Sequence, residues 1–122
     1  MKPTMILALL GALLLASCGT PAPDPADAVE RYLTAKIASD EPTLRALLCS
    51  SKEADLAQEV ASFASVEARM DGMVCQRDGD SDVVRCEGQI IAVYGGEDTV
   101  FPLTSYRVAQ EDGVWKWCGE AG

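Results

Sequence analysis

The hydrophobic pattern of this chain changes its period near Val66, and that change decides the fold class. After Val66, apolar and polar residues alternate in runs that Gly- and Asp-rich clusters separate. Alternation with a period of two is typical of half-buried strands, and short Gly/Asp clusters are typical of hairpin turns. The predicted strands are 68–76, 83–94, 100–110 and 114–118, with turns at 78–81, 95–98 and 111–113. Because these connections are short, successive strands are expected to pair antiparallel as a meander.

The segment before Val66 has the spacing of helices. Asp24 can cap a helix that starts at Pro25, and the residues after it repeat at intervals of three and four. The apolar stripe of this first helix consists of Val29, Tyr32, Leu33, Lys36 and Ile37, in which only Lys36 is not apolar. The stripe predicts that this helix packs one face against a core.

Two further short helices are expected after a break at 39–42. The first of them would bury Leu44, Leu47 and Leu48. The S-x-x-E sequence at 50–53 has the form of a capping box and predicts the start of a third helix, with an apolar stripe of Leu56, Val60 and Phe63. Helices that precede a long antiparallel sheet predict an α+β fold, in which short N-terminal helices pack on one face of a curved sheet.

The N-terminus has the pattern of an export signal. Lys2 is followed by a run of twelve apolar residues, Met5 to Ala16, which is well short of the ~20 that span a bilayer as a helix. Residues Leu15-Ala16-Ser17-Cys18 resemble the bacterial lipobox, in which cleavage precedes a lipid-carrying cysteine. An ordinary secretory signal with a chance cysteine is the alternative.

These features predict three segments: a signal peptide at 1–17, the lipidated Cys18 with a Pro-rich tether over 18–25, and a single α+β domain over 26–122. The mature chain would be held by fatty acyl chains such as palmitate on the extracytoplasmic side of the cell membrane or the outer membrane. The tether would reach only about 20 Å at ~3.1 Å per residue, so the domain would stay close to its membrane.

Four cysteines remain once Cys18 is assigned to lipid. An even number in an exported chain indicates disulfide bonds, and three pairings are possible. A hairpin that turns near 79–81 would place Cys75 opposite Cys86, which leaves Cys49 for Cys118 by elimination. A thiolate metal site is the alternative, but the chain has neither CxxC spacing nor a histidine.

Charge and composition exclude several kinds of function. The formal net charge is −9, so nucleic acid is not an expected partner, because its binding requires a basic surface. The absence of histidine removes the commonest general base and the commonest transition-metal ligand. The hydroxyl residues considered as nucleophiles have neither a histidine nor an adjacent lysine to activate them, which argues against a nucleophilic hydrolase; they are Ser62, Ser65, Thr104 and Ser105. No cofactor is expected.

Carboxylates offer two weak candidate sites. The segment 78–82 carries aspartates at alternate positions, like the start of a calcium loop, but Val83 and Gln89 replace the glycine and glutamate that such a loop requires. A hairpin turn is therefore the preferred interpretation. Inward carboxylates for acid–base chemistry would have to come from Asp71, Glu87, Glu97 or Asp98, and most of these are expected to face solvent.

The whole pattern resembles the nuclear transport factor 2-like (cystatin-like) family. The resemblance rests on the opening helix pair 24–48, its Ser39-Asp40-Glu41 break, and a sheet that ends in Tyr106-Arg107-Val108 and Gly113-Val114-Trp115-Lys116-Trp117. It implies a cone-like α+β fold. The family includes isomerases and cyclases that place Asp and His inside the cone, as well as members that only bind or dimerise, and the missing histidine departs from its enzymatic subset.

Aromatic residues are the candidate ligand-binding residues, because they are large enough to line such a cone and have polar tips. They are Tyr32, Tyr94, Tyr106, Trp115 and Trp117, with core packing as the alternative role. The leading hypothesis is a non-catalytic lipoprotein that binds a small ligand or an envelope protein. The second is an isomerase- or cyclase-like enzyme with an inward carboxylate, and the third is a structural homodimer with Ile91 and Val93 in its seam.

Overall fold

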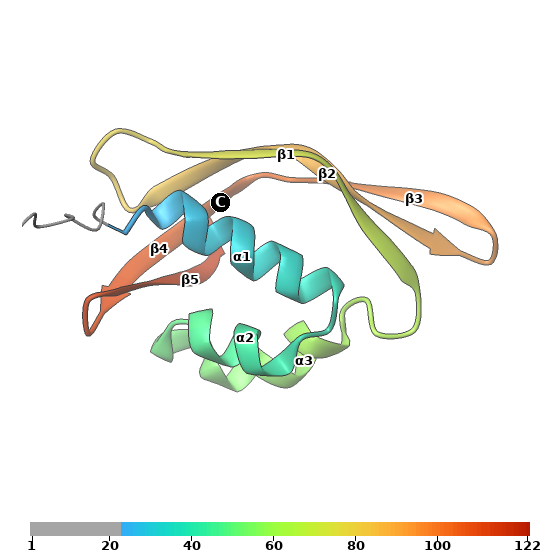
Figure 1. Ribbon diagram of the computed structural model, residues 1–122, viewed down its shortest axis with the longest axis horizontal. Coiled ribbons are helices and arrows are strands. Elements are labelled where there is room, and N and C mark those ends of the chain that lie inside the picture. Colours follow the sequence, from blue (N-terminus) through green and yellow to red (C-terminus); the bar gives the residue numbers. More distant parts are fainter. Residues whose placement is uncertain (1–22) are drawn as a thin grey trace, which may run out of the picture.

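The computed structural model describes residues 23–122 (Figure 1). The predicted signal peptide, Cys18 and most of the tether lie outside the described residues. Within residues 23–122, no helix is both long and apolar enough to span a bilayer.

Three short α-helices form the first half of the described chain. They are α1 (Pro25–Ile37), α2 (Glu41–Leu47) and α3 (Leu56–Ala61), and a 3-10 helix, η1 (Ser50–Asp55), precedes the last of them. The start of α1 is as predicted: the Asp24 carboxylate accepts a hydrogen bond from the Ala26 N–H at 2.9 Å, and Pro25 is the first helical residue. Asp40 caps α2 in the same way, through the Thr43 N–H at 3.3 Å.

The predicted capping box at 50–53 is wrong. Ser50 is the first residue of η1, and its N–H and hydroxyl both donate to Glu111 Oε2 at 3.0 Å. Because these groups are used across the fold, Ser50 does not cap a helix, and the segment up to Asp55 takes the tighter 3-10 form.

The second half is one antiparallel five-stranded sheet. Its strands are β1 (Glu67–Arg77), β2 (Val83–Tyr94), β3 (Glu97–Pro102), β4 (Ser105–Glu111) and β5 (Val114–Glu120). The strand order is β1-β2-β4-β5, and β3 also pairs with β2. Together with the helices this confirms the predicted α+β fold of short helices on an antiparallel sheet.

The single strand predicted at 100–110 is in fact two strands. β3 pairs with the second half of β2, and β4 pairs with its first three residues. Pro102 has no N–H to donate and ends β3, as expected for proline in a sheet. The two residues after it keep contact with β2, because Leu103 N–H donates to the Gly88 carbonyl and Thr104 accepts from Cys86 N–H, both at 3.0 Å.

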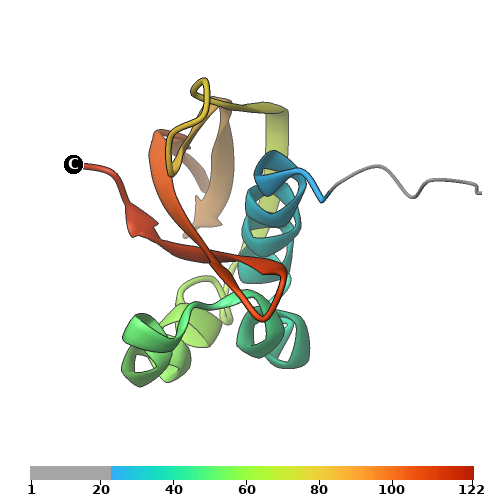
Figure 2. The same cartoon turned by 90° about the vertical axis from the view of Figure 1, so that its left-hand side faces the viewer.

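The sheet bends where β1 and β2 meet at glycines. Gly88 has φ +100° and Gly72 has φ +65°, and the β1–β2 register is irregular between Asp71 and Val74. A Cβ atom on Gly88 would lie 2.5 Å from the Gly72 carbonyl oxygen, so only glycine fits there. The bend curves the sheet around α1 (Figures 1 and 2), and the sheet remains open rather than closing into a barrel.

Replacing Gly88 by alanine is expected to lower the free energy of unfolding by about 2 kcal/mol, because the new Cβ meets backbone at a positive φ. Gly95→Ala is the matched control. Gly95 also has a positive φ, +57°, but nothing lies within 4 Å of its would-be Cβ, so its cost should be about 1 kcal/mol. Urea denaturation of both variants tests this, and equal losses would contradict the proposed backbone contact.

The core lies between α1 and the concave face of the sheet. The larger cluster of buried side chains joins α1 and α2 to β4 and β5, and includes Tyr32, Leu44 and Trp117. A smaller cluster of Phe63, Ile90 and Ala92 lies toward β3, and Met70 and Leu103 pack against both. These shared neighbours connect the two clusters into one core within residues 23–122.

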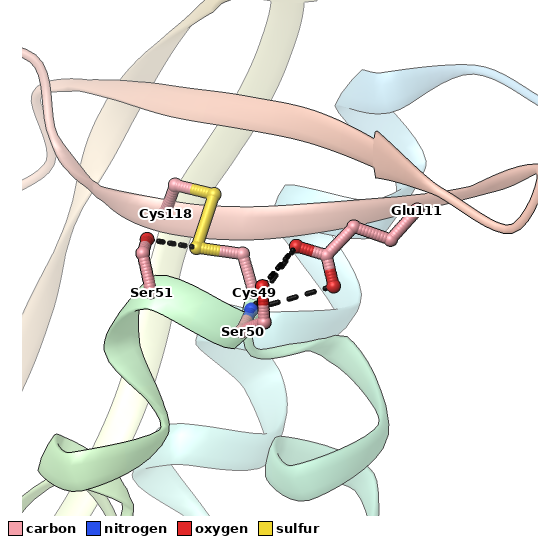
Figure 3. The surroundings of a disulfide bond; sticks show 5 residues. All are labelled: Cys49, Ser50, Ser51, Glu111 and Cys118. Carbon is pink, nitrogen blue, oxygen red and sulfur yellow. Dashed lines mark hydrogen bonds between the residues drawn. A yellow bond between two sulfur atoms is a disulfide. The ribbon is translucent and has the colours of Figure 1, made fainter.

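Both predicted disulfide bonds are confirmed. Cys75 and Cys86 are direct partners in the β1–β2 register, with Cα atoms 4.1 Å apart. Cys49, which lies between α2 and η1, is bonded to Cys118 on β5 (Figure 3), with Cα atoms 5.3 Å apart. A backbone hydrogen bond of 2.9 Å from Cys49 N–H to the Trp117 carbonyl holds the same two segments together.

The Asp-rich segment 78–82 is the turn between β1 and β2, as predicted. The Ser81 hydroxyl donates to the Asp78 carbonyl at 2.6 Å, and the Arg77 guanidinium donates to the carbonyls of Asp80 and Ser81. Among residues 23–122, no group of three or more acidic or cysteine side chains is arranged to hold a metal ion.

Candidate ligand-binding pocket

A pocket of about 300 Å³ opens between α1, α3 and the concave face of the sheet. Its apolar walls are Leu33, Phe63, Ile90, Phe101, Pro102, Leu103 and Trp117, and its polar lining is Lys36, Glu59, Tyr106 and Glu120. A second hollow of about 450 Å³ adjoins it and shares Lys36, Phe63 and Phe101. Apolar walls with a few polar groups at one side are typical of small-molecule sites.

A buried carboxylate is the centre of the polar side. Glu59 on α3 is only 9% exposed. The Tyr32 hydroxyl donates to its Oε1 at 2.6 Å, and Lys36 Nζ lies 3.1 Å from its Oε2. Both carboxylate oxygens therefore have partners, which offsets the cost of burying this charge.

Sequence reasoning did not find Glu59, although a signal was present. Leu56 and Phe63 define the apolar face of the third helix, and Glu59 is three residues after the first and four before the second. It therefore lies on that same face. Lys36 is the corresponding residue on α1, because it is the one charged residue in an otherwise apolar stripe. These two charged residues on apolar faces, Lys36 and Glu59, form an ion pair.

The structure brings together three of the five predicted ligand-binding aromatics. The rings of Tyr32 and Trp117 are stacked, with centroids 4.1 Å apart, and Tyr106 lies 6.3 Å from Trp117. Tyr106 and Trp117 line the pocket, whereas Tyr32 is fully buried. Tyr94 is 42% exposed and lines the adjoining hollow.

Trp115 lies apart from the pocket. Its Nε1–H donates to the Pro23 carbonyl at 3.2 Å, and the Arg77 guanidinium lies 5.0 Å from its ring centroid. Trp115 therefore holds the chain where it enters α1, and it is not among the residues that line either hollow.

Trp117 has one polar atom without a partner. Its Nε1–H is buried and makes no hydrogen bond with any residue of 23–122. Buried indole N–H groups normally donate to an acceptor, because leaving one unpaired costs about 1–3 kcal/mol. Because the nitrogen itself is buried, this unpaired donor belongs to the packed core around Trp117 and not to the open surface of the pocket.

Both buried tyrosines stay protonated at physiological pH. Burial raises the pKa of Tyr32 well above its ordinary value, and the hydrogen bond to Glu59 raises it further. Burial also raises the pKa of Tyr106, and the nearby charge of Glu120 raises it further. The hydrogen bond that the Thr104 N–H donates to the Tyr106 oxygen lowers this pKa, but by less than burial raises it. The Tyr32 phenol is therefore the donor in its hydrogen bond to Glu59.

Stability is expected to fall as the pH rises above about 10. In the unfolded chain tyrosines lose their protons near pH 10, whereas Tyr32 keeps its proton in the fold well above that pH. The native state then binds one more proton than the unfolded state, so the free energy of unfolding falls with a slope that approaches about 1.4 kcal/mol per pH unit. Urea denaturation from pH 8 to 11 measures this, and Tyr32→Phe should decline less steeply than the original chain. Identical slopes for the original chain and Tyr32→Phe would show that Tyr32 does not keep its proton in the fold at high pH.

The other carboxylates considered for acid–base chemistry are on the surface. Asp71, Glu87, Glu97 and Asp98 are all exposed. Asp71 accepts a hydrogen bond from Gln89, and Asp98 pairs with Arg69 at 3.5 Å. The hydroxyl of Ser62, in the adjoining hollow, donates to the Gln58 carbonyl at 3.0 Å. The described residues that line the two hollows thus include no nucleophile paired with a base.

Fold and pocket together define a small disulfide-linked α+β domain with a ligand-sized hollow on the concave side of its sheet. No protein-family model, curated protein or solved structure matches the chain.

Proposed function

We propose that this chain is an exported, lipid-anchored protein of the cell envelope whose α+β domain binds a small ligand without transforming it. The observation that carries the proposal is the pocket between α1, α3 and the sheet, in which apolar and aromatic walls meet the Lys36–Glu59 pair. The two disulfides support export, because such bonds persist in oxidising compartments.

The anchor is tested at Cys18. Cells that express the full chain should incorporate labelled palmitate into it and retain it in the membrane fraction. Cys18→Ser should remove the label and release the domain. A membrane-bound, unlabelled Cys18→Ser protein would argue for a different mode of attachment.

The binding site is tested at Phe101, which lines both hollows and is 39% exposed, so shortening it should cost little stability. Small-molecule extracts of the native envelope should raise the melting temperature of residues 19–122 by several degrees, because a ligand that binds only the native state stabilises it. Phe101→Ser should abolish most of that rise. Val74→Ser is the matched control: Val74 is 55% exposed, does not line the pocket, and its variant should behave like the original chain.

A catalytic role for the pocket is the second candidate, and Glu59 is the observation that favours it, because it is an inward carboxylate of the kind that isomerases use. Its two oxygens are occupied by Tyr32 and Lys36, which favours binding over proton transfer. Turnover that Glu59→Gln removes while ligand affinity is kept would establish catalysis.

A homodimer is the remaining alternative. Its predicted seam lies on the convex face of the sheet, where Ile91 is only 9% exposed, between Arg69 on β1 and Val100 on β3. This leaves little of its apolar surface for a second copy, whereas stable dimers bury apolar residues at the centre of their interface.

A further inference from the structure

We infer that the ligand of the pocket is an organic cation, an ammonium group carried on a small apolar or aromatic body. This inference rests on the proposed binding function and names the chemical class of its ligand. It follows from the charges, the rings and the size of the pocket.

The charges of the pocket leave one carboxylate uncompensated. Lys36 is the only basic residue that lines either hollow, and it is 3.1 Å from Glu59, so these two charges offset each other. Glu120 also lines the pocket, at its solvent-exposed rim, and forms no ion pair with any residue of 23–122. It lies on β5 directly opposite Tyr106 on β4. The lining is therefore negative overall, in a chain whose net charge is already −9.

The aromatic walls favour the same charge. The faces of aromatic rings attract ammonium groups within about 6 Å of the ring centroid, and the attraction grows when water is excluded. Phe63, Phe101, Tyr106 and Trp117 all line the pocket. The Lys36 ammonium is already 5.9 Å from the Trp117 centroid, which shows that this ring accepts a cation as a neighbour.

An anionic ligand would be repelled by the carboxylates of the pocket. Its charge would lie near the buried Glu59, which Lys36 already offsets, and would be repelled by Glu120 at the exposed rim, where solvent screens part of the repulsion. Lys36 could pair with it only by giving up Glu59, which would then be a buried carboxylate without a cation. The volume of about 300 Å³ is at the lower end for ligand pockets and suits a small molecule.

The test compares three probes of similar shape and different charge: phenethylamine, phenethyl alcohol and phenylacetate. Residues 19–122 carrying Trp115→Phe are secreted through an oxidising compartment and titrated with each probe. In this variant all tryptophan fluorescence comes from Trp117, which lines the pocket. Phenethylamine should bind at least about tenfold tighter than the alcohol, and phenylacetate should bind more weakly than both.

Two further variants test which carboxylate attracts the ammonium group of the ligand. Glu120→Gln should weaken phenethylamine binding by about two- to fivefold, the range for an exposed charge pair, and leave the alcohol unchanged. Glu87→Gln removes the same charge from the opposite face of the sheet, where Glu87 is exposed, and should change affinity less than about twofold. A cooperative thermal transition checks that each variant is folded.

The outcomes separate the inference from the proposed function. Tighter binding of phenethylamine that is weakened by Glu120→Gln and not by Glu87→Gln supports an organic cation as the ligand. If phenethyl alcohol or phenylacetate binds equally well or more tightly, the ligand is not a cation, but the pocket still binds small molecules. A Trp117 signal that responds to none of the three probes overturns both.

Discussion

Removing the Cys49–Cys118 disulfide by a double alanine substitution should lower the free energy of unfolding by about 4 kcal/mol. The bond joins residues 69 positions apart, and in the chain-entropy model a loop of that size gives about this value. The loss would be a large part of the 5–15 kcal/mol that a small domain typically has. Urea denaturation without reductant measures it.

The Cys75–Cys86 pair is the internal comparison. Its cysteines are only 11 positions apart and are already partners in a β-hairpin, so the same treatment should cost about 3 kcal/mol. A larger loss at this pair than at the first would contradict the loop-length explanation. Because Figure 3 places the first bond between the helical half and β5, its loss should also loosen η1 more than the hairpin, as hydrogen exchange would report.

Replacing Lys36 by methionine should cost about 3 kcal/mol, although methionine suits an apolar stripe better than lysine does. The variant leaves the Glu59 carboxylate, whose side chain is 12% exposed, without its cation. Adding Glu59→Gln should recover about 2 kcal/mol, because the amide still accepts the Tyr32 hydrogen bond without a charge. Thermal or urea unfolding of the two single variants and the double variant gives the coupling energy.

Arg45→Met is the matched control for that cycle. Arg45 and Glu41 form an ion pair of 2.8 Å on α2, but their side chains are 67% and 52% exposed. Solvent screens such a pair, so its loss should change stability by less than about 0.5 kcal/mol. Equal losses at Lys36 and Arg45 would show that burial of the Lys36–Glu59 pair contributes nothing.

Local sequence patterns predicted most of the fold. β2 spans Val83–Tyr94, the predicted boundaries, because a run rich in β-branched residues between two Gly/Asp-rich turns leaves little freedom. The hairpin between Cys75 and Cys86 was predictable for the same reason, and the second disulfide followed from it by elimination.

The errors arose where distant contacts decide the local structure. The continuous strand predicted at 100–110 is interrupted after Pro102, whose missing N–H is a local signal, at the level where the sheet bends at Gly88. The capping box failed because Ser50 bonds to Glu111, 61 residues away. The local pattern around Ser50 does not reveal that partner.

The pocket was only partly predictable. Aromatic residues were recognised by type, but type alone does not separate Trp117, which lines the pocket, from Trp115, which holds the start of α1. Glu59 and Lys36 are two charged residues on facing apolar stripes, and only the packing of α3 against α1 makes them partners. Pairs of such exceptions on different helices are a usable signal for buried polar sites.

The most direct test of the binding pocket is native mass spectrometry of residues 19–122, secreted through an oxidising compartment of a bacterial host. A protein that binds a small ligand should carry an additional mass in a fraction of the molecules, at the mass expected for two disulfides. Phe101→Ser should lose this additional mass and Val74→Ser should keep it. A bare protein in all three samples, or a bound mass that Phe101→Ser retains, would contradict a ligand site between α1, α3 and the sheet.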